Sequence, residues 1–270
     1  MPHVLFDLGT VAYAVSAYLY LVGWFGRYRW GARWATYSLL AAVLLHGGAV
    51  ASRWLTFGFP FLTLREILSL YAWLLALLYL GIERRFGYTI LGVLVVPLGV
   101  VTILVASLLP PAHEPLLPLL QSPWLTAHVG VFFSAYAAFT LAFAAALAYL
   151  LQERALRRKR PAWDLPPLAV MDALSRWSAT VGLVLMVAAI FTGSAWAERV
   201  WGTPWVWEPK QALSLLTVGV YALYFYVRHV SYGPTRRAAW LIVAGFVSVL
   251  ITFIGAELLA PTGLHSFLFR

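Results

Sequence analysis

The chain has 270 residues, of which 62% are hydrophobic and only 11% are charged, with a formal net charge of +9 and no cysteine. A soluble globular domain needs far more polar surface, so the composition excludes that class of protein. The lack of cysteine excludes a disulfide, a thiolate ligand or a cysteine nucleophile within this chain.

The apolar residues form eight long runs, each sufficient to cross a hydrocarbon core that takes about 20 helical residues. Lipid offers the backbone no hydrogen-bond partners, so the runs are predicted to be helices, and they are too long for barrel strands. The first run lacks a basic n-region and a clear cleavage site, and we expect it to be retained. The predicted spans are 5–25, 35–52, 62–81, 88–109, 124–151, 177–195, 211–229 and 238–258. They predict an all-α, polytopic membrane bundle in one transmembrane domain over residues 1–270.

Basic residues set the predicted orientation. Most of the 19 Lys and Arg residues lie in the first, third, fifth and seventh loops. A basic protein can bind nucleic acid, but charge in short loops between spans is typical of the positive-inside pattern instead. The rule places these loops in the cytoplasm. Both termini and loops two, four and six are therefore predicted to face outward.

His46, His128 and His265 all fall on the predicted outward side. His128 begins the fifth span, His265 follows the eighth, and His46 lies in the outer half of the second. A lone histidine is usually a hydrogen-bonded packing residue. Two at matching depth, with no acid placed for a proton relay, favour a pair that holds haem iron from opposite faces.

The loop between the sixth and seventh spans is rich in tryptophan. Trp196, Trp201, Trp205 and Trp207 occur within a short stretch that also holds Gly, Pro and charged residues. Tryptophan prefers the headgroup level of a bilayer, so an interfacial belt is one interpretation. The other is a flat, rigid surface for a planar apolar ligand, and the residues alone leave both open.

Residues Trp201–Lys210 resemble the tryptophan-rich WWD motif, commonly written WGxxWxWDPKE, of the cytochrome c assembly family of haem-handling proteins. Leu64–Trp73 is similar to the family's YESLxFLSW segment, Leu120–His128 to LQSxWLxxHV, and Gly263–Ser266 to GLHSY. With eight spans, the resemblance fits the CcsA type of the two-component system II better than the six-span CcmC type.

The resemblance implies a cytochrome c haem lyase or synthase of the inner (cytoplasmic) membrane. Such a protein presents haem b, its substrate, on the periplasmic or extracytoplasmic side for thioether attachment to apocytochrome c at a Cys-x-x-Cys-His site. It also implies a CcsB (ResB-like) membrane subunit as partner. No side chain is assigned as catalytic.

Site residues carry over where the motifs match. The family pattern makes His128 and His265 the axial ligands of the haem iron. It makes the motif tryptophans haem contacts, with Trp196 in the lead-in, and Glu208 stands where the family usually has Asp. Apart from the motifs, propionates are anionic, and each of four outward basic residues is a candidate partner for them or a contact of a lipid headgroup: Arg53, Arg65, Arg199 and Lys210.

One position departs from the family. The in-membrane histidine of the family's YLHxR segment corresponds here to Tyr226. Tyrosine can ligate haem iron, but packing is the competing role. His229 lies one turn further and is either a substitute ligand or a juxtamembrane residue. Two other function classes stay open: a transporter of a small solute and a bis-His electron-transfer cytochrome of the membrane.

Overall fold

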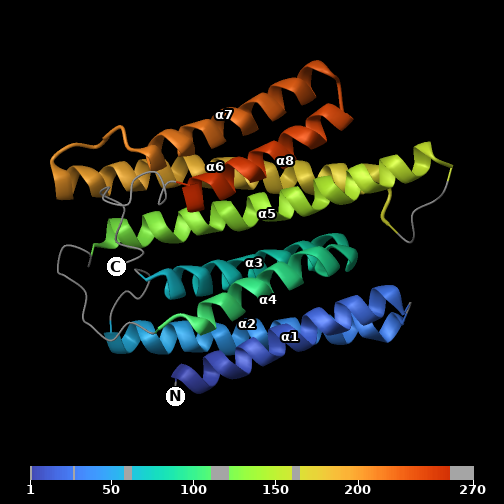
Figure 1. Cartoon of the computed structure of the whole chain (residues 1–270), viewed down its shortest axis with the longest axis horizontal. Helices are drawn as coiled ribbons and strands as arrows, with labels where there is room; N and C mark the ends of the chain where they lie inside the picture. Colours follow the sequence, from blue (N-terminus) through green and yellow to red (C-terminus); the bar gives the residue numbers. More distant parts are fainter. Residues whose placement is uncertain (1, 27, 58–62, 111–121, 160–164, 256–270) are drawn as a thin grey trace. The chain divides into compact units, whose positions relative to one another are not determined.

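A computed structural model describes residues 2–26, 28–57, 63–110, 122–159 and 165–255 (Figure 1). Eight helices in this part of the chain are long and apolar enough to cross a membrane, which confirms the predicted all-helical membrane fold. The helices are α1 Pro2–Phe25, α2 Arg29–Phe57, α3 Leu64–Phe86, α4 Ile90–Leu108, α5 Pro123–Arg157, α6 Leu168–Trp201, α7 Pro209–Val230 and α8 Arg236–Leu250. A short π-helix, η2 Ile251–Gly255, follows α8 directly.

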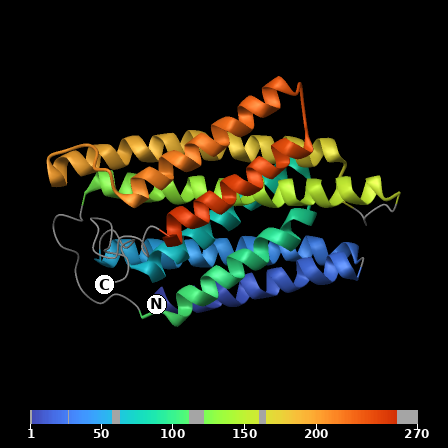
Figure 2. The ribbon, with the colours of Figure 1, turned by 45° about the horizontal axis from the view of Figure 1, so that its top comes forward.

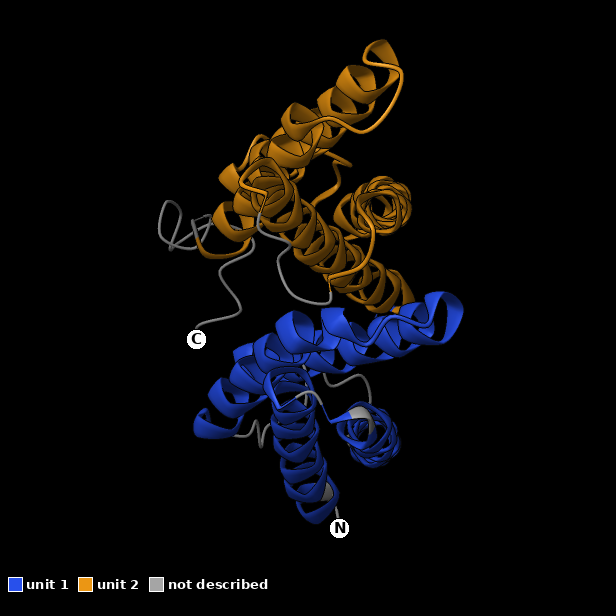
Figure 3. Ribbon diagram, turned by 90° about the vertical axis from the view of Figure 1, so that its right-hand side faces the viewer, with its two compact units in different colours: residues 1–122 blue, residues 123–270 orange. Residues whose placement is uncertain are grey.

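The helices form two compact units, coloured separately in Figure 3. Unit 1 is Met1–Ser122 and unit 2 is Pro123–Arg270. In unit 1, α1 packs along α2 and α3 along α4, and α1 also contacts α4. In unit 2, α5 packs along α6, α7 along α8, and α8 also lies on α5. A single domain over the whole chain stays a prediction.

Most helices extend past the predicted spans at one end or both, because a helix continues beyond the apolar segment that lipid requires, whereas α4 lies within the predicted 88–109. The span predicted to begin at residue 177 starts at Leu168, and the one predicted to end at 151 continues to Arg157. Local signals set other ends. Thr63 and Glu66 form a capping box at the start of α3, and Gly202 ends α6 with φ 71°, a left-handed conformation that glycine adopts without strain.

Helix α5 is the centre of unit 2. Its inner face is lined with alanines, which let α6 approach closely. Small residues are typical of helix–helix interfaces in membranes for this reason. Gly182 of α6 serves the same purpose, because a Cβ there would lie 2.5 Å from the ring of Phe139. Phe139 in turn stacks on Tyr221 of α7, with ring centroids 3.9 Å apart.

The connections of unit 2 place several segments at one end of its bundle. Figures 1 and 2 show the start of α5, the end of α6, the start of α7 and η2 all at that end. His128 and the tryptophan-rich loop therefore share an end of unit 2, as their sequence positions predict.

Candidate functional site

His128 lies one and a half turns into α5 and faces α6. Its Nδ1 is 2.8 Å from the backbone oxygen of Ala189. Its ring also lies against Phe132, with centroids 5.6 Å apart. Gly193, one turn further along α6, leaves room for the imidazole, since a Cβ there would lie 2.7 Å from Nδ1. The side chain is thus held from two helices.

The bond to Ala189 fixes the form of the imidazole. A backbone carbonyl only accepts hydrogen bonds, so Nδ1 of His128 donates and carries a proton. In a neutral imidazole the lone pair is then on Nε2. Haem iron requires that lone pair, and an Nδ1–H bond to a carbonyl is the usual way in which a protein orients a metal-ligating histidine.

The tryptophan-rich loop is short and anchored at both ends. Gly202 turns the chain out of α6, and Glu208 is the residue before α7, with Pro209 at its first position. Between them, the hydroxyl of Thr203 donates to the Trp205 carbonyl at 3.1 Å. The backbone N–H of Val206 donates to a side-chain oxygen of Gln211 at 3.2 Å, which ties the loop to α7.

The four indoles form two edge-to-face pairs. Trp196 and Trp201 lie 5.1 Å apart between ring centroids, and Trp205 and Trp207 lie 5.6 Å apart. Trp196 is only 4% exposed, whereas Trp207 is 76% exposed. A belt in the headgroups would leave all four rings outward, so the pairing and the unequal burial favour a built surface.

A cation–π contact joins this surface to α5. The guanidinium of Arg199 lies 5.3 Å from the ring centroid of Trp124, in the first turn of α5 and four residues before His128. Arg199 and Lys210 are the predicted propionate partners that belong to unit 2. The end of unit 2 therefore combines indole rings, an imidazole and basic side chains.

Two buried donors test whether the site suits haem. The indole N–H groups of Trp196 and Trp205 are buried and have no hydrogen-bond partner within the described residues. A buried, unpaired N–H costs about 1–3 kcal/mol, so such groups normally meet an acceptor. The residues fit the predicted substrate, because haem supplies carboxylate acceptors together with a planar apolar body.

Other predicted ligands have different settings. His265 lies outside the described residues, and its pairing with His128 stays a prediction. Tyr226 is 65% exposed near the end of α7 farthest from the loop, and His229 is also exposed there. Tyr224, two residues earlier, is buried instead. Neither Tyr226 nor His229 is held by unit 2 in the way that His128 is.

His46 belongs to unit 1 and is buried among α1, α2 and α3. Its Nε2 lies 2.7 Å from the Ser69 hydroxyl, and its Nδ1 lies 3.4 Å from the Tyr13 hydroxyl. Phe6 and Tyr13 meet the ring edge to face. Both ring nitrogens of His46 thus have partners within unit 1, which is the setting of a packing residue. A contact of His46 with haem stays a prediction.

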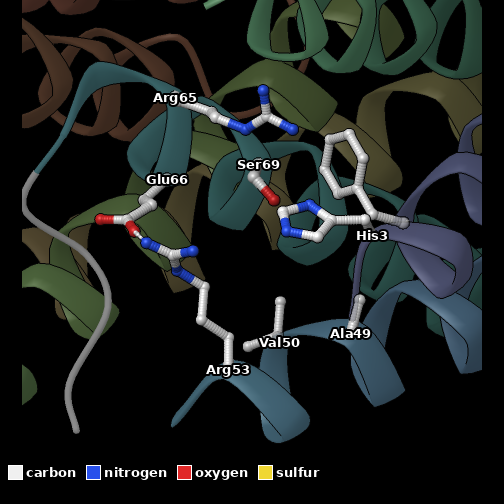
Figure 4. Close-up of a pocket in the computed structure, with 8 residues that line it drawn as sticks. His3, Ala49, Val50, Arg53, Arg65, Glu66 and Ser69 are labelled. Atoms are coloured by element: carbon white, nitrogen blue, oxygen red, sulfur yellow. Dashed lines mark ion pairs between the residues drawn. The ribbon is translucent and has the colours of Figure 1, made fainter. Parts of the chain in front are cut away.

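Arg53 and Arg65 line a pocket of about 60 Å³ in unit 1 (Figure 4). Arg53 forms an ion pair with Glu66. Arg65 donates to the backbone oxygen of Leu109 at 2.6 Å, which ties α3 to the end of α4. Both guanidiniums thus have protein partners, and their proposed contact with propionates stays a prediction.

The sequence missed residues that support the site. Gly193 and Ala189 position His128, Gln211 holds the loop, and Trp124 packs on Arg199. Trp124 and Gly193 carried a signal, since each stands in a segment that resembles the family. Neither hydropathy nor composition reveals a hydrogen bond to a backbone carbonyl or the space that a glycine leaves for a neighbouring side chain.

The sequence is similar to those of several known proteins. A family model described as "Cytochrome C assembly protein" matches residues 61–265. The chain is 31% identical over 256 residues to "Cytochrome c biogenesis protein CcsA" of Synechococcus sp. (strain CC9902), which covers 84% of each chain. It is 32% identical to the protein of the same name in Parasynechococcus marenigrum (strain WH8102), again covering 84% of each. A third relative of that name, in Synechococcus sp. (strain CC9605), is 32% identical over 85% of each.

Proposed function

This chain belongs to the cytochrome c assembly protein family, and from that premise we propose that it is the haem-presenting subunit of a cytochrome c synthase. It is a multi-pass membrane protein with a role in cytochrome c biogenesis. We propose that it lies in the inner membrane and offers haem at the outer face for covalent attachment to apocytochrome c.

The orientation of His128 carries the proposal. Its Nδ1–H donates to Ala189, so Nε2 has the lone pair, and this imidazole lies at the same end of unit 2 as the paired indoles. His265 is proposed as the second axial ligand. Two axial imidazoles keep oxygen and peroxide from the iron, and they must be displaceable because the histidine of the Cys-x-x-Cys-His site replaces one.

The chain's own residues would act by binding and orientation. We propose that the N–H groups of Trp196 and Trp205 donate to the propionates and that Arg199 and Lys210 add charge. The exposed ring of Trp207, with Trp201 and Glu208, would border the haem edge where apocytochrome c arrives.

The supported reaction adds a substrate thiol across each haem vinyl group. A carbon–sulfur bond forms at one vinyl carbon, the thiol proton goes to the other, and the carbon–carbon double bond becomes single. Both thiols belong to apocytochrome c, which suits a chain that contains no cysteine. Holding the groups in contact raises their effective concentration, and no side chain needs to act as acid or base. A CcsB (ResB-like) subunit is the proposed partner.

The test measures haem in the purified, detergent-solubilised protein. His128→Ala and His265→Ala, made separately in the full chain with its partner co-expressed, are expected to remove most co-purifying haem and to stop cytochrome c maturation in a deficient host. Imidazole added to the medium is expected to restore haem to His128→Ala, because it replaces a ligand and not a packing residue.

His3→Ala is the control for the loss of a histidine that is not proposed as a ligand, since His3 is exposed in unit 1 and lines the pocket of Arg53 and Arg65. It is expected to behave as the wild type. Full haem content and full maturation in the double variant of His128 and His265 would reject the proposed ligands. A haem-loaded protein that never supports maturation would instead indicate an electron carrier.

A further inference from the structure

Helix α7 turns a polar face into the interior of unit 2. Residues spaced three and four apart lie on one side of a helix, and five such positions on α7 bear polar side chains. Four of the five are buried and the last is partly buried. This polar face of α7 consists of Ser214, Thr217, Tyr221, Tyr224 and Arg228.

The opposite side of α7 is apolar and exposed, as expected toward lipid. Leu216, Leu223 and Val230 lie there. Polar groups inside a membrane span usually face a water-filled cavity or one another, because lipid cannot hydrogen-bond them. The polar face of α7 therefore needs partners from within unit 2.

Hydroxyls from three elements meet near the middle of this face. The Ser248 hydroxyl of α8 lies 3.1 Å from Thr217 Oγ1 and 2.6 Å from the Gly245 carbonyl, and Thr252 of η2 lies 3.3 Å from Thr217 Oγ1. Thr217 donates its own proton to the Leu213 carbonyl at 3.0 Å, and Thr252 donates to the backbone of Ser248 at 2.7 Å. With those protons used, the threonine oxygens act as acceptors.

Phenolic hydroxyls extend from this cluster without completed hydrogen bonds. Tyr136 of α5, Tyr221 and Tyr224 have buried hydroxyls with no hydrogen-bond partner within the described residues. The hydroxyl of Tyr136 lies beside Thr252, and that of Tyr224 lies beside Arg228. A phenolic hydroxyl can donate one hydrogen bond and accept others, so each of these buried groups has capacity that an ordered water molecule can satisfy.

A charged pair ends the face. Arg228 meets Asp172 of α6 in a two-pronged ion pair, with Nη2 2.7 Å from Oδ2. The second hydrogen bond of this pair joins Nη1 to Oδ1. Polar atoms thus continue along α7 from the hydroxyl cluster to this ion pair, through most of the span.

We propose that the polar face of α7 binds a file of ordered water molecules, running from the Thr217 cluster past Tyr221 and Tyr224 to Arg228. Each orphaned hydroxyl would otherwise cost about 1–3 kcal/mol, and ordered water in proteins typically makes about three hydrogen bonds of this kind. A bulky ligand is excluded at the centre, because Tyr221 stacks on Phe139 at 3.9 Å. The inference goes beyond the proposed function and does not depend on haem.

Radiolytic hydroxyl-radical labelling tests the proposal, because it modifies side chains beside bound water even where bulk solvent has no access. The purified full chain in detergent is exposed to a synchrotron pulse and tyrosine modification is read by mass spectrometry. We expect Tyr136, Tyr221 and Tyr224 to be labelled at least several-fold faster than Tyr20 and Tyr79. The two control tyrosines are equally buried, but Glu83 accepts their hydrogen bonds. Equal labelling of the two sets would overturn the proposal.

Replacing single tyrosines by phenylalanine gives an independent test of the proposal. Tyr221→Phe deletes a hydroxyl that either forms hydrogen bonds to water or forms none. If water is bound, the variant loses those bonds and its Tm falls. If the hydroxyl has no partner, its removal raises the Tm or leaves it unchanged, and the proposal fails. Tyr224→Phe repeats the test at a second position, and Tyr79→Phe, which loses a bond to Glu83, lowers the Tm in either case.

Discussion

At the scale of single residues, the proposed site depends on groups that orient the His128 ligand and on a buried donor, Trp196, that is proposed to meet the substrate. His128 takes its tautomer from the Ala189 carbonyl and its position from the missing side chain at Gly193. Trp196 keeps its ring buried while its N–H has no described partner. Each feature can be removed by a small substitution that leaves the ligand in place.

Gly193→Ala is expected to displace the imidazole of His128. The new Cβ would lie 2.7 Å from Nδ1, so the ring must move and lose its bond to the Ala189 carbonyl. Losing about 1–1.5 kcal/mol corresponds to a roughly tenfold weaker binding of haem. Haem titration followed at the Soret band measures it. Gly130→Ala on α5 is the control, since nothing lies within 4 Å of its new Cβ. Equal affinity in both variants would contradict the positioning role of Gly193.

Trp196→Phe retains an aromatic ring and removes one N–H donor. If that N–H meets a propionate, haem affinity is expected to fall about 3- to 10-fold, the value of one hydrogen bond. The same titration measures it, with Trp240→Phe, at an exposed position of α8, as the control. Unchanged affinity together with a higher Tm would show that the donor was unsatisfied in the complex as well.

At the scale of elements, helix ends in unit 1 are joined through buried polar groups that hydropathy does not reveal. The carboxylate of Glu83, near the end of α3, accepts a hydrogen bond from Tyr20 of α1 at 2.5 Å. It also accepts bonds from Thr36 of α2 and from Tyr79 one turn earlier on α3. One carboxylate thereby ties three helices at the same end of the unit, and hydroxyl donors stabilise its buried charge.

Glu83→Gln is expected to destabilise the protein by about 1.5–3 kcal/mol, because hydrogen bonds to a charged acceptor become bonds to a neutral one. The amide also places an N–H₂ donor against hydroxyls that now donate to the carboxylate. Thermal unfolding in detergent, followed by tryptophan fluorescence, measures the effect. Asp7→Asn, at an exposed acid of α1, should leave the Tm unchanged. Equal unfolding of both variants would show that Glu83 does not hold the helix ends together.

At the scale of the whole molecule, each unit forms its own helical core. The proposed haem site uses residues of unit 2, while His46 and the pocket of Arg53 and Arg65 belong to unit 1. The orientation of all eight helices rests on the distribution of basic residues. It can be tested directly, because a chain without cysteine accepts a single reporter cysteine.

Thr203→Cys and Ser231→Cys place that reporter beyond the two ends of α7. In intact cells, an impermeant maleimide is expected to label the first, in the tryptophan-rich loop, and to leave the second unlabelled until the membrane is opened. The positive-inside distribution requires this result. The reverse pattern would place the loop in the cytoplasm and exclude attachment of haem at the outer face.

The membrane class, the eight spans and the family could all be predicted from the sequence. Eight apolar runs can only be helices in lipid, and the resemblance of Trp201–Lys210 predicted the family that the match over residues 61–265 confirms. The sequence also predicted that His128 and the indole-rich loop lie at the same end, since successive spans cross the membrane in alternating directions. His265 is still known from sequence alone.

Tertiary structure decided what each side chain faces. Hydropathy did not distinguish buried Tyr224 from exposed Tyr226, nor reveal that His46 bonds to Ser69 and His128 to a carbonyl of α6. The reason is physical. Lipid is as apolar as a bundle core, so burying a leucine gives little preference for one rotation of a membrane helix over another. Close contacts at small residues and the pairing of scarce polar groups fix that rotation, and both form only when the helices meet.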